Sequence, residues 1–329
     1  MNNTSDTGTA PILLKNEKLT VEIAQPGEHY NGTRFDWSGF ITQVTLDDQH
    51  TFCMPESLKP GKGTGGSGLC NEFGIEKPVG YDEVPVGGLF PKLGIGVLRR
   101  SDESRYRFAR PYEIVERFPI IIDADEQQVV FYVEPVECNG YAARLRKTIS
   151  ISGAELTIDY VLENAGSRDL VTHEYCHNFL RIDGHQIGPD YVLRMPYPIS
   201  LERMGGHFGA MLPRWMRSLL PQSWLAKLGH MVFRRMLAVL SIRDNEIRWT
   251  STPEKAFYCR LQGFHQTGQA QWTLRHEPSG VQIQEYDDFA PARVAVWGVQ
   301  HVVSAEVFVD IDLKPGQSKN WQRRYVMSA

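Results

Sequence analysis

The segment VVSAEVFVDIDL, residues 302–313, alternates apolar and other side chains with the two-residue period of a β-strand. Ala305 and every second residue up to Leu313 are apolar, which places Glu306, Phe308 and Asp310 on the opposite face. Similar short segments, bounded by Gly, Pro, Asn and Asp, recur along the chain at residues 19–23, 39–46, 94–99, 129–136, 155–162, 271–276, 281–285 and 293–297. This pattern predicts an all-β fold of antiparallel strands joined by turns.

The chain lacks the signatures of other common enzyme folds. No G-x-G-x-x-G motif follows a predicted strand, and the strands do not alternate with amphipathic helices, which argues against a nucleotide-binding α/β sheet. Because no repeat of about 40 residues is present, a sandwich is favoured over a propeller. The chain has 329 residues, and since large sandwiches exceed the average domain size, we predict a single domain spanning residues 1–329.

One stretch, residues 201–243, breaks the β pattern. Its apolar residues fall at helical spacing with basic residues between them, which predicts one or two amphipathic helices interrupted near Pro221. We expect this helical insertion to cover a sheet or to form the contact of a homodimer. Contact with a membrane surface is the less favoured alternative, because no lipid anchor motif accompanies it.

Charge and cysteine usage narrow the partners. A formal net charge of -4 leaves no excess of basic residues for phosphate contacts, so nucleic acid is not an expected partner. No apolar run of about 18 residues is present, and the N-terminus does not resemble a signal peptide. The five cysteines are scattered and form no C-x-x-C pair, which predicts packed thiols in a reducing, cytoplasmic compartment.

The segment THEYCHNFLRIDG, residues 172–184, carries the residues best suited to chemistry. As a strand it would project His173, Tyr175, His177 and Phe179 to one side. Such a row suits a site where a sugar stacks on rings while its hydroxyl groups find hydrogen-bonding partners. The alternative is that these histidines are ordinary surface or hydrogen-bonded core residues.

Glu306 is the second candidate. Its strand position points away from the apolar face, so the plain alternative is a solvated acid on a half-exposed strand. With ordinary pKa values of about 4.3 for Glu and about 6.5 for His, Glu306 is expected to be ionised near neutral pH and most of His177 to be neutral.

Several motifs resemble the aldose 1-epimerases, or galactose mutarotases. The run HNFLRIDG, residues 177–184, resembles the strand motif that carries the family's catalytic histidine. Glu306, shortly before LKPG at residues 313–316, resembles the catalytic glutamate, which also precedes an L-x-P-G turn. Residues 156–170 are similar to the approach to the histidine strand, and NGTRFDWSG, residues 31–39, resembles an early strand of a mutarotase-like subgroup. The likeness covers nearly the whole chain except residues 201–243.

The resemblance implies a galactose-mutarotase-like supersandwich of two large antiparallel sheets, with a sugar on the concave face. It implies no metal and no organic cofactor. Glu306 would act as the base that deprotonates the anomeric hydroxyl, and His177 as the acid that protonates the ring oxygen. The ring would open and reclose on its other face. His177 and Glu306 must therefore lie close together in space.

The chain departs from the family in two places. The second active-site histidine of the family is missing, because the corresponding region, residues 105–112, offers arginines instead. The substrate is therefore expected to be a monosaccharide or modified sugar that is acidic or unusual, with Arg107 and Arg110 available to a carboxylate, sulfate or phosphate. The alternative is that these arginines are surface residues. The family's Leu-His-Gly-Gly segment is replaced by residues 71–76, in which Glu72 is a binding candidate.

The remaining binding candidates are charged or aromatic residues near these motifs: Arg34, Trp37, His173, Tyr175, Trp297 and His301. The Gly-rich stretch 59–68 predicts a mobile surface loop that is either a lid or an inert connection. Two other functions stay open at this point. One is a carbohydrate-binding protein without turnover, and the other is a different sugar-active enzyme, a lyase or epimerase, using the same pair.

Overall fold

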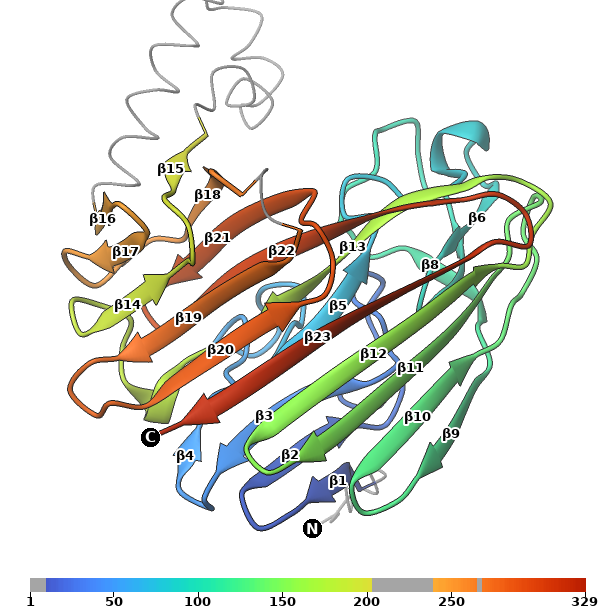
Figure 1. Ribbon diagram of the computed structural model, residues 1–329. Helices are drawn as coiled ribbons and strands as arrows, with labels where there is room; N and C mark the ends of the chain where they lie inside the picture. The colour runs from blue at the N-terminus through green and yellow to red at the C-terminus, as the bar shows by residue number, and fades with distance from the viewer. Residues whose placement is uncertain (1–9, 203–238, 265–267) are drawn as a thin grey trace, which may run out of the picture.

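The computed structural model describes residues 10–202, 239–264 and 268–329, and within them every strand pairing is antiparallel (Figure 1). The first sheet has ten strands in the order β1 (Ile12–Lys15), β2 (Leu19–Ala24), β3 (Phe40–Leu46), β5 (Leu69–Phe73), β13 (Leu170–Asn178), β22 (Val302–Leu313), β21 (Arg293–Val299), β18 (Phe257–Gln262) and β15 (Ser200–Leu201), with β4 (His50–Thr51) beside β3.

The second sheet also has ten strands, in the order β16 (Leu240–Arg243), β17 (Glu246–Trp249), β14 (Tyr191–Arg194), β19 (Ala270–His276), β20 (Gln282–Asp287), β23 (Ser318–Ser328), β12 (Glu155–Asn164), β11 (Ala143–Ser152), β10 (Gln128–Val133) and β9 (Ile120–Ala124). A third sheet consists of β6 (Leu89–Lys92), β7 (Gly96–Arg99) and β8 (Glu113–Arg117). Two short 3₁₀ turns, η1 (Tyr81–Glu83) and η2 (Ile182–Gly184), complete the described elements.

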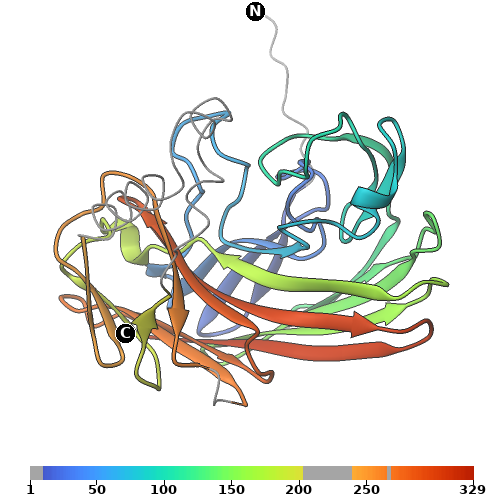
Figure 2. The same cartoon turned by 90° about the horizontal axis from the view of Figure 1, so that it is seen from above.

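The two large sheets stack face to face, and the main core lies between them (Figure 2). Strand β12 shows why, since its alternating sequence buries Leu156, Ile158, Tyr160 and Leu162 against the first sheet. The ring of Tyr160 stacks on Trp321 of β23 at a centroid distance of 4.8 Å. The predicted all-β class and the sandwich of two large antiparallel sheets are therefore confirmed.

The predicted helical insertion is corrected at both ends. Leu201 belongs to β15, and residues 240–243 form β16, a strand that pairs with β17 through a turn at Asp244. A backbone φ of 51° at Asp244 suits such a tight hairpin turn. Residues 203–238, on which the rest of the prediction falls, lie outside the described part of the chain.

A fully buried ion network crosses the core between the two sheets. The Arg323 guanidinium lies 2.8 Å from Glu174, 3.2 Å from Glu285 and 3.3 Å from Asp287. Burial raises the pKa of both Glu285 and Asp287, and Asp287 is raised further because Glu285 lies beside it. One cation thus faces three buried acids, and the raised pKa values of Glu285 and Asp287 favour the protonated forms of these two.

Two further observations bear on the sequence predictions. All five cysteines are buried and unpaired, which agrees with the prediction of packed thiols. Within residues 10–202, 239–264 and 268–329, no helix has the length and apolar character needed to cross a membrane.

Candidate functional site

His177 and Glu306 face each other from neighbouring strands of the first sheet. Strand β13 pairs with β22 from Leu170↔Leu313 to Tyr175↔Phe308, where the ladder stops, and the isolated bridge Leu180↔Val303 restores it. Within this interruption, Nε2 of His177 lies 3.2 Å from Oε1 of Glu306. Two residues from distant parts of the sequence therefore form a direct contact.

Strand alternation sends this pair to the face of the first sheet that looks away from the core. Glu174 and Cys176, on the other face of β13, are buried between the sheets. Figure 2 shows the segments coloured blue and cyan rising on one side of the stacked sheets. In a second buried cluster, Tyr30 and Phe35 from the first of these segments pack with Phe179, which follows β13. The pair thus lies under a cover of loops.

Aromatic rings enclose the imidazole of His177. Its ring stacks on Phe179 at a centroid distance of 3.8 Å, and the edges of Phe35 and Trp297 approach at 6.1 Å and 5.4 Å. The Gly-rich segment completes the cover, because a Cβ at Gly66 would stand 2.8 Å from the Phe35 ring and closer still to Phe179. The side chains of His177 and Glu306 are only 5% and 4% exposed, so any molecule that reached them would have to displace part of this cover.

Burial decides where the proton of the pair lies. Burial raises the pKa of Glu306 to about 8, although the nearby Arg34 and Arg293 charges oppose the rise. Burial also lowers the pKa of His177 well below its usual value, and the charge of Arg34 adds to this effect. The prediction of an ionised Glu306 is therefore wrong for this covered site. Near pH 7 the pair holds one proton, mainly on Glu306.

The raised pKa of Glu306 predicts how the stability of the folded protein depends on pH. Since the pKa of Glu306 is about 8 in the folded protein and near 4.5 ordinarily, the folded state keeps a proton that the unfolded state loses between these values. Stability contributed by the protonated carboxyl is thus present below about pH 4.5 and is lost as the pH rises to about 8. We expect Glu306→Gln to gain stability relative to the unsubstituted protein by a few kcal/mol between pH 5 and pH 8.

Urea unfolding of both proteins at several pH values measures this difference. A difference that stays constant from pH 5 to pH 8 would contradict the raised pKa. The titratable or charged groups that interact with Glu306 from the surrounding elements are Arg34, Glu72, Glu76, Tyr175, His177, Tyr258, Cys259 and Arg293.

A second buried group adjoins the pair. Arg34 donates from Nε to Glu72 at 2.8 Å, from one terminal nitrogen to Tyr175 at 3.0 Å and from the other to Thr64 at 2.8 Å. The Tyr175 hydroxyl also donates to Glu72, at 2.7 Å. Lys92 Nζ lies 3.5 Å from the same carboxylate, and burial lowers its pKa to about 8. Three sequence candidates, Arg34, Glu72 and Tyr175, are thus brought together.

A hollow of about 210 Å³ opens beside this group. Arg34, Thr64, Phe108 and Arg110 are among its lining residues. The Arg34 guanidinium lies between two rings, 4.4 Å from the centroid of Phe35 and 4.3 Å from that of Phe108. The Phe35 ring also lies edge-on to His177, at a centroid distance of 6.1 Å, so Arg34 and Phe35 stand between the hollow and the pair.

His173 lies further along the same face of β13. Its Nε2 is 2.6 Å from Oε2 of Glu76, and Arg293 forms an ion pair with the same carboxylate. Burial alone would raise the pKa of Glu76, but the bonds from His173 and Arg293 outweigh it and lower the pKa to about 2. The Arg293 guanidinium also lies 3.6 Å from the centroid of Phe308. This cluster extends the polar face beyond the pair.

Solved structures share this architecture. A galactose mutarotase-like protein from Lactobacillus casei ATCC 334 is 14% identical, with 97% of this chain and 100% of that chain covered and a TM-score of 0.56. A galactose mutarotase related enzyme from Lactobacillus acidophilus is 12% identical, with 97% of each chain covered and a TM-score of 0.56. The fold is that of the galactose mutarotase-like proteins.

A third solved structure is similar to this chain, whereas comparisons of the sequence find no match. The structure of a GalM/aldose epimerase homologue from C. elegans is also similar to this chain, at 10% identity and a TM-score of 0.50, with 97% of this chain and 98% of that chain covered. No protein-family model matches the chain, and neither does any curated protein sequence. At such identities the likeness establishes the fold alone.

Four sequence candidates lie apart from the pair within the galactose mutarotase-like fold. Trp37 is buried in the second cluster, where its indole donates to the carbonyl of Gly32 at 2.9 Å. His301 contacts the carbonyl of Glu56 at 3.1 Å. Among the arginines, Arg107 is exposed and Arg110 is paired with Asp102, so neither is aimed at His177 or Glu306.

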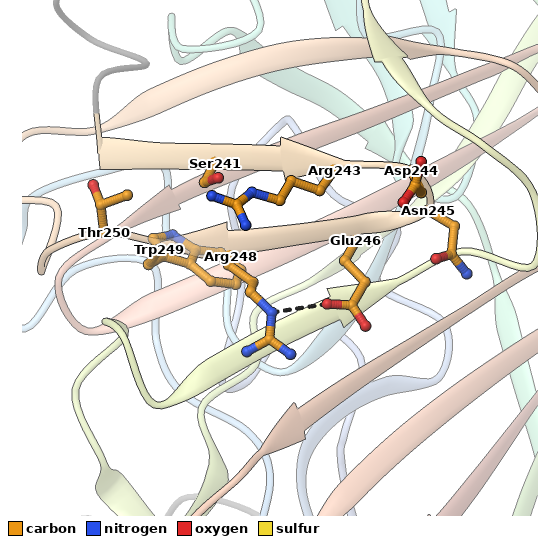
Figure 3. A pocket seen from close by; sticks show the side chains of 8 residues that line it. All are labelled: Ser241, Arg243, Asp244, Asn245, Glu246, Arg248, Trp249 and Thr250. Atoms are coloured by element: carbon orange, nitrogen blue, oxygen red, sulfur yellow. Dashed lines mark hydrogen bonds and ion pairs between the residues drawn. The ribbon is translucent and has the colours of Figure 1, made fainter.

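A separate hollow of about 600 Å³ lies along the hairpin β16–β17 of the second sheet (Figure 3). Two of its charged residues form an ion pair, since Arg248 lies 2.8 Å from Glu246, and Arg248 also lies 3.0 Å from Glu277, which does not line the hollow. Among the described residues, no group of three or more His, Cys, Asp or Glu side chains is placed to hold a metal ion.

Sequence reasoning missed residues that shape the site. Phe35 approaches the imidazole of His177 edge-on, beside Phe179, which the alternation of the strand had placed on the same face, but Phe35 itself was not predicted to lie there. Asn178, next to His177, was assigned no role, although strand alternation points it into the core. The signal in the sequence was a polar amide at an inward strand position, because a buried amide, as Asn178 is, must be hydrogen-bonded.

Proposed function

We propose that the chain interconverts the α and β anomers of a free reducing monosaccharide, with His177 as the acid and Glu306 as the base. The observation that carries the proposal is the 3.2 Å contact between the two groups on the outward face of the first sheet. The galactose mutarotase-like fold supports it, because neighbours with this fold are named as mutarotase-like or epimerase-like proteins. The sugar has to lie on this face, under the aromatic cover.

In the proposed reaction the anomeric hydroxyl loses one proton and the ring oxygen gains another. Glu306 takes the proton of the hydroxyl on the anomeric carbon while His177 gives its proton to the ring oxygen. The bond from the anomeric carbon to the ring oxygen breaks, which yields the open-chain aldehyde. After rotation about the adjacent carbon–carbon bond the ring closes on the other face, and both protons return. General acid–base catalysis of this kind contributes about 10²–10⁴-fold.

In the covered site the proton lies on Glu306, whereas the proposed roles require it on His177. Burial places the proton on Glu306, so it must first pass to Nε2 of His177 across the 3.2 Å contact. A sugar supplies hydroxyl groups that solvate a carboxylate, which favours this transfer. His177 Nδ1 is buried without a hydrogen-bond partner in the described part of the chain. The sugar is a candidate to satisfy it.

The charges around the pair favour a neutral sugar over an acidic one. Arg34 is paired with Glu72, Arg293 with Glu76 and Arg110 with Asp102. A carboxylate or phosphate on the substrate would have to compete with these acids, at a cost in desolvation. We therefore propose a neutral monosaccharide, although the sequence had suggested an acidic one.

Polarimetry on a panel of neutral and acidic aldoses tests the proposal. Starting from a pure anomer, the protein is expected to accelerate mutarotation of at least one neutral sugar over the buffer rate, and the acidic sugars less. Acceleration confined to acidic sugars would overturn the substrate class. Binding of a sugar without any acceleration would indicate a carbohydrate-binding protein, and chemical conversion of the sugar would indicate a different sugar-active enzyme.

A further inference from the structure

Asn178 occupies the place where the ladder between β13 and β22 is interrupted. Its backbone N–H donates to the Ser304 hydroxyl at 3.1 Å. Its side-chain Nδ2 donates to the carbonyl of Ala305 at 2.7 Å. Because Asn178 follows His177 and Ala305 precedes Glu306, a side-chain amide links the two strands beside the pair.

The amide of Asn178 has only one workable orientation. Besides Ala305, Nδ2 donates to the Glu285 carboxylate at 3.0 Å, while Oδ1 accepts from the Tyr325 hydroxyl at 2.9 Å. A flipped amide would set its oxygen 2.7 Å from the Ala305 carbonyl, which can only accept a hydrogen bond. The side chain is fully buried, so the three bonds fix it from the core side.

Arg323 holds the other neighbour of Glu306. It donates to the carbonyl of Val307 at 3.0 Å and lies 3.2 Å from Glu285, the acid that also binds Asn178. The backbone on both sides of Glu306 is therefore held by buried side chains, Asn178 from β13 and Arg323 from β23. The Glu285 carboxylate contacts both of them.

We propose that Asn178 is a positioning residue, which holds β13 and β22 at the separation that sets the distance between His177 and Glu306. The inference rests on the proposed function for its effect on rate, but the geometry it describes does not. In a continuous ladder, main-chain bonds fix the distance between facing residues; here the Asn178 amide replaces them. A misplacement of about 1 Å in a catalytic group costs about 10²-fold in rate.

A matched pair of variants tests the role of Asn178. Asn164 is an equally buried asparagine whose Nδ2 donates to the carbonyl of Leu313, at the far end of the same strand β22, at 2.8 Å. Both Asn178→Ala and Asn164→Ala remove a buried amide from a β22 carbonyl. We expect kcat for mutarotation to fall about 10- to 100-fold in Asn178→Ala, with little change in KM. Asn164→Ala is expected to keep kcat within about twofold while losing stability.

Two further measurements keep the outcome decisive. If Asn178→Ala does not fold, Ser304→Ala and Tyr325→Phe each remove one bond of Asn178 and are expected to lower kcat in the same direction. The pH titration of the His177 imidazole NMR signals, without sugar, is expected to change in the Asn178 variant and not in the Asn164 variant. Equal losses of kcat in both asparagine variants, or an unchanged imidazole titration in the Asn178 variant, would overturn the proposal.

These results also separate the inference from the proposed function. If the unsubstituted protein accelerates no sugar, the proposed function fails. The imidazole titration then still reports whether Asn178 positions His177, since it requires no turnover.

Discussion

Glu306→Gln and His177→Ala are each expected to lower kcat for mutarotation by about 10²–10⁴-fold. The amide of Gln cannot accept the proton of the anomeric hydroxyl, and Ala offers neither a proton nor an acceptor. Because the two groups lie 3.2 Å apart and the proposed reaction needs both, we expect them to act as a unit. The double variant is therefore expected to be little slower than either single one. Polarimetry with a pure anomer measures all three rates.

Asp310→Asn provides the matched control for Glu306→Gln. Asp310 stands on the same strand and the same face but is exposed and has no partner among the described residues. Its substitution is expected to leave the rate within about twofold of the unsubstituted protein, since exposed groups without partners contribute little. A Glu306→Gln protein that keeps its full rate would remove the carboxyl from the mechanism.

Arg323→Met is expected to cost about 3–5 kcal/mol of unfolding free energy at pH 8. The substitution leaves Glu174, Glu285 and Asp287 buried without their cation. The pKa values of Glu285 and Asp287, already raised by burial, should rise further, so that the folded variant binds protons the unfolded chain has lost. Stability then falls as the pH rises above the ordinary carboxyl range, and part of the loss is recovered at pH 5.

Urea unfolding at pH 5 and pH 8 measures both effects. Arg324→Met is the control, because the neighbouring Arg324 is 36% exposed and paired with Glu155 at the surface. It should cost no more than about 1 kcal/mol at either pH. A loss in Arg323→Met that is small, or equal at the two pH values, would show that the buried acids do not depend on this cation.

The strands were largely predictable because the outward and inward residues of β12 and β22 differ in polarity. Their alternation fixes the strand and its buried face from local sequence alone. The facing of His173, Tyr175 and His177 followed from the same rule. What no local rule supplies is which strands are neighbours, and the contact between β13 and β22 depends on this order.

The interior polar network could not be read from the same rule. Glu285 and Asp287 lie on the same inward face of β20 as Ile283. A prediction based on polarity would have placed these two acids on the solvent-exposed face. Their burial is possible only because Arg323 arrives from β23. The raised pKa of Glu306 was missed for a related reason. It depends on burial, and part of the cover, such as the segment with Phe35, comes from loops that have no periodic pattern.

A crystal structure with a neutral monosaccharide bound tests the central claim most directly. The account predicts a pyranose on the outward face of the first sheet, with the covering rings displaced. Its anomeric hydroxyl and ring oxygen should lie within about 2.6–3.2 Å of Glu306 and His177. A sugar bound elsewhere, for example along the hairpin β16–β17, with His177 and Glu306 still covered, would contradict the account.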